Sequence, residues 1–296
     1  MRDLDNSSAA KNQKKVERCI EAAFFICAFF AVFSVAFIAF YILSRGIPAI
    51  KQIGLIDFIF GRMWEPTGEF FGIWNMIVGS IYATFGAVII GLPIGLFTAV
   101  FLAELAPPNL AKIMRTAINL LAGIPSVVYG FFGLVVIVPF IDKIFGGGGN
   151  SLLATVIILS IMILPTIINL SETSIRAVPR HYKEGSLGLG ATHIETIFKV
   201  ILPAAKSGIL ASVVLGIGRA VGETMAVILV SGNTPLIPHS IFERLRTMTA
   251  TIAMEMSYSS GLHQEALFGI GVVLFIFIMI LNLMLNYFTS KIGGEK

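Results

Sequence analysis

Charged residues are scarce in this 296-residue sequence: Lys, Arg, Asp and Glu make up 13% of it, whereas hydrophobic residues make up 56%. A soluble domain has about 25% charged residues, so the shortage excludes an ordinary water-soluble globule. Six segments are uncharged or nearly so, and each has the roughly 20 residues that a helix needs to cross a bilayer. They are Ala22 to Leu43, Gly72 to Ala103, Thr116 to Ile141, Ser151 to Ser171, about Ser207 to Gly232, and Ala266 to Ser290. The sequence therefore predicts an all-α, polytopic membrane protein with six transmembrane helices.

Cysteine and histidine are also rare, with two and four residues respectively. Cys19 and Cys27 are about 12 Å apart along a helix that rises 1.5 Å per residue, which is too far for a disulfide. The histidines have none of the spacings of a zinc site, so we expect no metal. The glycine-rich stretch "FGGGGN" lacks the Gly-Lys-Ser/Thr of a phosphate-binding loop. If ATP drives this protein, another subunit must bind it.

Basic residues are unevenly distributed among the loops. With the N-terminus in the cytoplasm, 14 of the 21 Lys and Arg residues fall on cytoplasmic segments and six on external ones, and the last is Arg219, inside a span. The positive-inside rule then puts both termini in the cytoplasm. We divide the chain into a cytoplasmic tail (1–18), a transmembrane domain (19–290) with a long loop at about 172–206, and a cytoplasmic tail (291–296). The net charge of +4 reflects this topology, not a nucleic-acid partner.

The third span contains "GIPSVVYGFFG", in which Pro125 removes a backbone donor and three glycines weaken the helix. Two interpretations stay open: a kinked packing helix, or a break that lines a cavity, where protein or water satisfies the irregular backbone.

Two external loops carry interpretable features. Trp64, in "WEPTGEFFG", is expected to lie half in the headgroup region. Ser240 and Glu243 have the spacing of a capping box, which predicts a short helix at the interface. That helix would present Glu243, Arg244 and Arg246 to an external partner, although a solvated charged face is the simpler interpretation.

The loop between the fourth and fifth spans needs structure of its own, because it is about 36 residues long. Pro179 suits the first turn of a helix, which Gly188 and Gly190 would end. Thr192 and Glu195 then have capping-box spacing, so a second helix should run from there to Pro203. The loop is predicted to fold as helix, turn and helix on the cytoplasmic face.

A spaced set of residues in this loop resembles the EAA loop of the membrane subunits of binding-protein-dependent ABC importers. The set consists of Glu184, Gly185, Ser186, Gly190, Val200, Leu202 and Pro203. The resemblance implies a type I ABC importer permease (MetI-like) fold, in which the short helix docks into a groove of the ATPase subunit. Small residues suit such a helix because they keep its contact face slim.

The likeness extends along the chain through "WEPTGEFFGI", "GIPSVVYGFFGL", "ILPTI", "GIGRAVGETMAV" and "GNTPLIPHSIF". These stretches are similar to the PstC-type permease subunits of phosphate importers. The resemblance implies a heterodimer with a PstA-type permease, a PstB-type ATPase dimer that binds ATP and Mg, an external phosphate-binding protein, and a location in the cell membrane. The chain itself would be no enzyme, would bind no cofactor, and would conduct inorganic phosphate inward.

Arg219 and Glu223 stand in the otherwise apolar fifth span. Arg219 lies about 20 Å from the cytoplasmic edge at Lys206, near the midplane. In one continuous helix Glu223 would share its face, and glycines flank both residues. A charge inside a span costs about 3 kcal/mol, so such residues pair or line a cavity. One hypothesis is a closed ion pair that locks the bundle; the other is that Arg219 contacts phosphate while Glu223 restrains it or accepts a proton from the substrate. Thr224 could add a hydroxyl, although a bond to its own backbone is the simpler expectation.

Three rival functions are open. A sulfate or molybdate importer subunit would share the fold. A secondary anion transporter or channel would have inverted repeats and paired broken helices, which the sequence does not reveal. A membrane enzyme would have to use Arg219 and Glu223 without a nucleophile or metal beside them.

Overall fold

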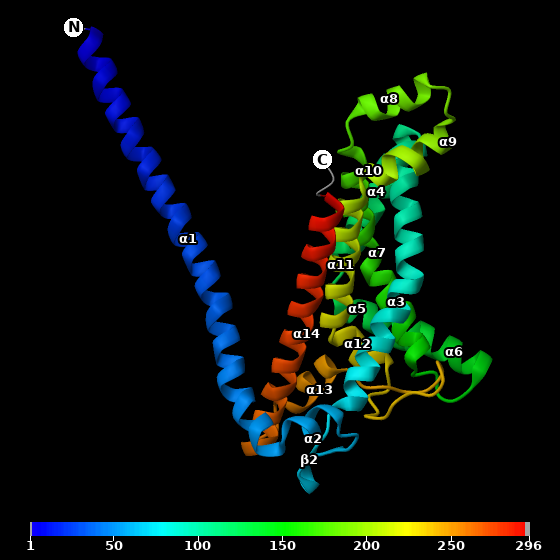
Figure 1. Ribbon diagram of the computed structural model, residues 1–296. Helices are drawn as coiled ribbons and strands as arrows, with labels where there is room; N and C mark the ends of the chain where they lie inside the picture. Colours follow the sequence, from blue (N-terminus) through cyan, green and yellow to red (C-terminus); the bar gives the residue numbers. More distant parts are fainter. Residues whose placement is uncertain (1, 294–296) are drawn as a thin grey trace.

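The computed structural model describes residues 2–293 and is almost entirely helical (Figure 1). Its helices are α1 (Arg2–Ile53), α2 (Leu55–Phe60), α3 (Trp74–Val100), α4 (Pro108–Gly123), α5 (Ser126–Phe132), α6 (Val138–Phe145), α7 (Leu152–Arg176), α8 (Arg180–Gly188), α9 (His193–Thr196), α10 (Leu202–Ala204), α11 (Lys206–Gly222), α12 (Met225–Val230), α13 (Met248–Glu255) and α14 (Gly261–Gly293). Three π-helical segments extend them, at Phe101–Leu105, Gly133–Ile137 and Ile197–Ile201. One antiparallel hairpin of β1 (Trp64–Glu65) and β2 (Phe70–Phe71) is the exception to the predicted all-α class.

Five helices are long and apolar enough to cross a membrane, and a sixth span is obtained if the bent pair His193–Ala204 and Lys206–Gly222 counts as one. The predicted polytopic helical architecture is therefore confirmed. One boundary was wrong: the third span runs over Ser126–Phe145, not from Thr116. Pro125 and Ile124 have extended backbone, which separates the amphipathic helix α4 from the span.

The centre of the bundle is the contact between α3 and α7. Glycines on α3 meet branched side chains on α7, and a Cβ added to Gly91 would lie only 2.7 Å from Ile163 Cδ1. Close approach of this kind maximises van der Waals contact, which drives helix association in lipid. Ile163 and Ile167 are almost fully buried there. The glycines of the second span thus let α3 and α7 pack closely.

Two spans are broken, and the broken parts pack together. α5 begins after the break at Pro125, α12 begins after a break at Glu223, and Gly130 of α5 lies against Ala226 of α12. The Tyr129 hydroxyl donates to the carbonyl of Leu121, at 2.8 Å, and so satisfies a group at the end of α4. The structure shows a break at Pro125, as the second interpretation expects, and the cavity that this interpretation places beside the break stays a prediction. Paired broken helices, which the sequence does not reveal, are therefore present.

The first helix is longer than predicted. α1 begins at Arg2, so all but Met1 of the expected 1–18 tail belongs to it. Figure 1 shows α1 leaning away from the bundle and meeting α14 near its own C-terminal end; there a Cβ on Gly46 would lie 2.7 Å from the Phe268 carbonyl oxygen. At the other terminus α14 continues to Gly293, and the rest of the expected 291–296 tail lies outside the described residues. The start of α1 and the end of α14 lie toward the end of the molecule that carries α8 and α9.

The opposite end is more compact than predicted. Trp64 is buried rather than half exposed to headgroups, and its Nε1 donates to Glu255 at 3.0 Å. No helix begins at Ser240: the chain turns there, and α13 begins after Thr247, whose hydroxyl accepts from the Ala250 N–H. The carboxylate of Glu243 accepts from the His239 N–H instead of capping Ser240.

Candidate functional site

Arg219 lies in the last turn of α11, half-buried. Its Nη1 donates to the Thr166 hydroxyl of α7 at 3.2 Å. Sequence analysis gave no indication of Thr166 as a partner, because its role depends on how α7 packs beside α11. Arg219 is therefore directed toward α7 by one hydrogen bond from its charged guanidinium to a neutral hydroxyl, a kind of bond worth about 1.5–3 kcal/mol.

Glu223 is not one turn along the same helix, as predicted. α11 ends at Gly222, and Glu223 itself has extended backbone (φ −70°, ψ 131°). Its carboxylate accepts from the Ala226 N–H at 3.1 Å, at the start of α12, and its carbonyl accepts from the Thr249 hydroxyl at 3.0 Å. A carboxylate is the preferred acceptor for the orphan donors of a helix start. Glu223 thus stabilises the broken helix, and the expectation of a shared helical face was wrong.

Arg219 and Glu223, both among the described residues, form no ion pair with each other. The space beside them is open, because a Cβ added to Gly218 or Gly222 would meet nothing within 4 Å. Gly216 differs, since it packs against Ile167. The hydroxyl of Thr224 donates to the carbonyl of Gly222, the backbone bond expected for it. In this conformation the closed ion pair is absent and the guanidinium borders free space.

The long loop folds as predicted. α8 carries Glu184, Gly185 and Ser186, and ends before Gly190, which has a left-handed φ of +89°. Thr192 and Glu195 form the expected capping box at the start of α9. No residue of α8 is buried, and added Cβ atoms on its two glycines would meet nothing within 4 Å. Figure 1 shows α8 projecting from the end of the bundle. This slim helix is free to contact another protein.

Members of the EAA-like set divide into two environments. Glu184 and Gly185 are exposed, as is Pro203 beyond α9. Ser186 instead faces its own loop, where its hydroxyl lies 2.9 Å from that of Thr196. Leu202 packs against the buried cluster of α3, α4 and α7 side chains. The first group is available for a partner, and the second holds the loop to the bundle.

Glu104 joins this loop to α3 and was missed in the sequence. Its carboxylate is 10% exposed and lies 2.5 Å from Lys183 Nζ on α8 and 3.6 Å from His193 Nε2 on α9. Glu104 belongs to the π-helical segment Phe101–Leu105 that extends α3. The Lys183–Glu104 ion pair therefore links α8 directly to the end of the span formed by α3.

Glu255 organises the other end and was also missed. Its buried carboxylate accepts from Trp64 Nε1 (3.0 Å) and Arg246 Nη1 (2.7 Å) and lies 2.9 Å from His263 Nε2. Arg246 Nε also donates to the Asn233 carbonyl. Arg246 is thus an internal structural residue, and the expectation that it faces a partner was wrong; Glu243 and Arg244 are exposed.

Comparison with known protein families identifies the family of this chain. The family model described as "Binding-protein-dependent transport system inner membrane component" matches residues 91–294. The chain belongs to this family. The matched region of this transport component includes both the α8 loop and the Arg219 segment. Paired broken helices are present, so they do not distinguish this chain from a secondary transporter. Its membership of the binding-protein-dependent transport family does.

Curated relatives include several permeases. The chain is 37% identical over 272 residues to the probable ABC transporter permease protein YqgH of Bacillus subtilis, covering 90% of this chain and 88% of that protein. It is also 37% identical over 240 residues to the phosphate transport system permease protein PstC of Pasteurella multocida, covering 74% and 75%. The PstC protein of Mesorhizobium japonicum is 34% identical over 268 residues, covering 83% and 82%.

Solved structures support the fold. A chain of the inward-facing MetNI methionine ABC transporter superposes with a TM-score of 0.58 at 22% identity, covering 78% of this chain and 99% of that one. A chain of a bacterial ABC transporter that imports the acidic polysaccharide alginate gives a TM-score of 0.63 at 15% identity, covering 94% and 99%. The expected MetI-like importer fold is confirmed.

Proposed function

We propose that this chain is a membrane-spanning subunit of an ATP-driven importer of inorganic phosphate. The observation that carries the proposal is the half-buried Arg219 guanidinium, which has one neutral hydroxyl partner at 3.2 Å and open space beside it. A guanidinium stays charged at any physiological pH and matches the oxygens of a tetrahedral anion. Further support comes from relatives that are named phosphate permeases.

Glu223 contributes selectivity in this proposal. Hydrogen phosphate carries a proton that it can donate to the Glu223 carboxylate, whereas sulfate at neutral pH has none and is repelled. The contacts of the anion with Arg219 and Glu223 are weak in this proposal, since a release route works best when the anion leaves readily. Thr224 is a lesser contributor, because its hydroxyl is engaged with backbone.

The remaining subunits follow from the family. A second, PstA-type permease would complete the pathway, a PstB-type ATPase dimer would receive α8 through Glu184, Gly185 and the adjoining small residues, and a phosphate-binding protein would dock at the opposite end. ATP is hydrolysed by the separate ATPase subunit. In this arrangement α8, the start of α1 and the end of α14 face the cytoplasm, with 1–18 and 291–296 as the cytoplasmic ends of the transmembrane domain.

The test is phosphate uptake by the complex reconstituted in liposomes with its co-purified partners and the binding protein. Arg219→Ala should assemble normally and abolish uptake. Arg45→Ala, which removes an exposed arginine of α1, is the matched control and should transport normally. Wild-type uptake of sulfate or molybdate but not phosphate would favour the sulfate-type alternative. Normal phosphate uptake by Arg219→Ala would refute the pathway role.

A further inference from the structure

One face of α7 carries a line of polar side chains: Thr166, Asn169, Thr173 and Arg176. Their spacing of three, four and three residues keeps them on a single face of a helix with 3.6 residues per turn. The other side of α7 in this region is buried: Ile167, Ile168 and Ile175 are 1%, 4% and 1% exposed, and the polar residues Ser171 and Glu172 are buried with them. This polar line is unexpected on a packed transmembrane helix.

The line begins at the proposed substrate contact. Thr166 is the residue to which Arg219 donates. From Thr166 to Arg176 the helix rises about 15 Å, at 1.5 Å per residue, toward the end of the bundle that carries α8 (Figure 1). The line therefore runs from Arg219 to the end of the bundle that the proposed function places in the cytoplasm.

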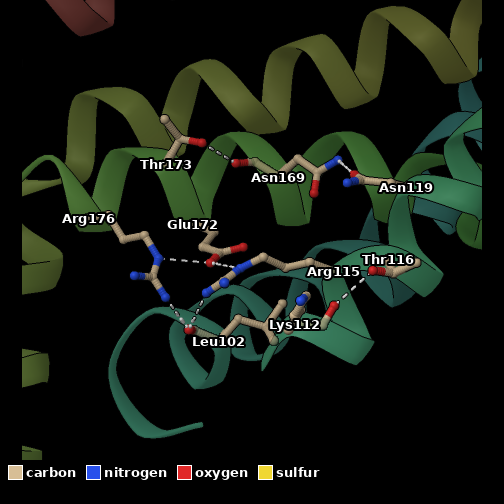
Figure 2. A network of polar contacts seen from close by, with 9 residues as sticks. All are labelled: Leu102, Lys112, Arg115, Thr116, Asn119, Asn169, Glu172, Thr173 and Arg176. Atoms are coloured by element: carbon tan, nitrogen blue, oxygen red, sulfur yellow. Dashed lines mark hydrogen bonds and ion pairs between the residues drawn. The ribbon is translucent and has the colours of Figure 1, made fainter. Parts of the chain in front are cut away.

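α4 supplies the facing wall, as Figure 2 shows. Asn169 Nδ2 donates to Asn119 Oδ1 of α4 at 3.1 Å, and both helices carry exposed side chains here. Amides joined in this way keep further N–H donors for another acceptor. Along α4, Arg115 lies four residues before Asn119, on the same face, with Lys112 one turn further. Donors and cations of α4 thus border the polar line.

Two arginines share one carboxylate at the inner end of the line (Figure 2). Arg115 Nε and Arg176 Nε donate to the same oxygen of Glu172, Oε1, at 2.7 and 2.9 Å. Their Nη2 atoms both reach the Leu102 carbonyl, at 3.3 and 2.7 Å. The Glu172 side chain is 7% exposed, whereas those of Arg115 and Arg176 are 37% and 48% exposed. One buried carboxylate opposes two accessible guanidiniums, so a positive charge is left at the surface.

We propose that this polar line is the inner half of the anion route, a proposal that rests on the proposed function. Hydrogen phosphate released by Arg219 moves past the amides of Asn169 and Asn119 and the Thr173 hydroxyl to the Arg115–Arg176 pair. Glu172 positions that pair and offsets half of its charge. Two uncompensated arginines would hold the anion tightly. The single net positive charge that Glu172 leaves still attracts the anion but lets it leave.

The first test measures the local potential and needs no transport. In the assembled complex, with Cys19 and Cys27 replaced by serine, Thr173→Cys reacts with an anionic and with a cationic methanethiosulfonate. Each rate is divided by the rate of the same reagent with glutathione. The anionic reagent should be favoured by about tenfold, since charged clefts concentrate counter-ions to this extent. Added Arg176→Gln should remove the preference, and phosphate should slow the anionic reagent. Equal normalised rates would overturn the proposal.

The second test uses transport and leaves the Glu172 network intact. Asn169→Leu combined with Thr173→Val should reduce phosphate uptake several-fold with an unchanged thermal midpoint. The control is Asn282→Leu with Thr98→Val, which makes the same two substitutions outside the polar line. Thr98 bonds the carbonyl four residues earlier, as Thr173 does, and Asn282 also bonds such a carbonyl. Equal uptake by the two double variants contradicts the route. A wild-type complex that moves no phosphate refutes the proposed function instead, while the labelling preference still tests the polar line.

Discussion

Glu255 and Glu223 are two carboxylates of one bundle with opposite surroundings. Glu255 is 5% exposed and is contacted by a tryptophan, an arginine and a histidine. Glu223 is half-buried and its carboxylate accepts one backbone N–H, with no cation beside it among the described residues. A saturated buried carboxylate fixes the elements that supply its donors. A carboxylate that accepts only one hydrogen bond and borders open space can still accept hydrogen bonds from a substrate. The comparison therefore separates a structural centre from the proposed transport site.

Breaking the saturated centre should have the largest effect on stability. Glu255→Ala removes the acceptor shared by the hairpin, the loop before α13 and α14, and leaves Arg246 buried without its counter-ion. Such a loss costs about 3–5 kcal/mol. Thermal unfolding of the purified complex should show a much lower midpoint. Glu243→Ala, an exposed carboxylate of the same region, is the control and should change stability by less than about 0.5 kcal/mol.

Thr166→Val should have a moderate effect. It releases Arg219 from its one hydroxyl partner at little cost in volume, and the expected loss is about 1.5 kcal/mol, the lower end for a hydrogen bond to a charged group. Uptake should fall less than in Arg219→Ala, because the guanidinium remains. Uptake as low as that of Arg219→Ala would mean that positioning by Thr166, not the charge itself, decides transport.

Glu223→Gln should separate stability from transport most clearly. Glutamine retains an oxygen that accepts from the Ala226 N–H, so stability should change by less than about 1 kcal/mol. The charge is lost, and phosphate uptake should fall strongly. Unfolding and uptake are measured on the same preparation. A large loss of stability with normal uptake per folded complex would assign Glu223 a purely structural role.

Thr224→Val should have the smallest effect. The Thr224 hydroxyl makes a bond of 3.2 Å to a backbone carbonyl, which is worth about 0.5 kcal/mol at an exposed position. Uptake and thermal midpoint should both stay near the wild-type values. A strong loss of uptake would make Thr224 a direct contact of the anion.

Local sequence rules predicted the local features well. The capping box at Thr192, the left-handed glycine at Gly190 and the helix after Pro179 depend on a few adjacent residues, and each is present. The rules failed where long-range packing decides the result. Trp64 donates a hydrogen bond to Glu255, which is 191 residues away in the sequence. Glu104 and Glu255 were missed for the same reason. The i,i+4 spacing of Glu172 and Arg176 was a local signal, but the second partner of Glu172, Arg115, is 57 residues away.

The fifth span shows the same limit inside the proposed site. Its apolar composition predicts a helix, but α11 ends at Gly222 because Thr249 and the Ala226 N–H provide partners for Glu223 outside a continuous helix. Backbone can leave helical geometry within a membrane only when other groups satisfy it.

The sequence by itself determined that this is a polytopic helical membrane protein, that one loop carries a slim helix-turn-helix, and that Arg219 and Glu223 are the exceptional charges of a span. These conclusions follow from hydropathy, short-range capping and charge content. Only the tertiary structure decided that Arg219 turns to Thr166, that Glu223 lies in a break, and that a polar line leads from them to two arginines. Those features depend on groups from separate helices meeting, which no local pattern specifies.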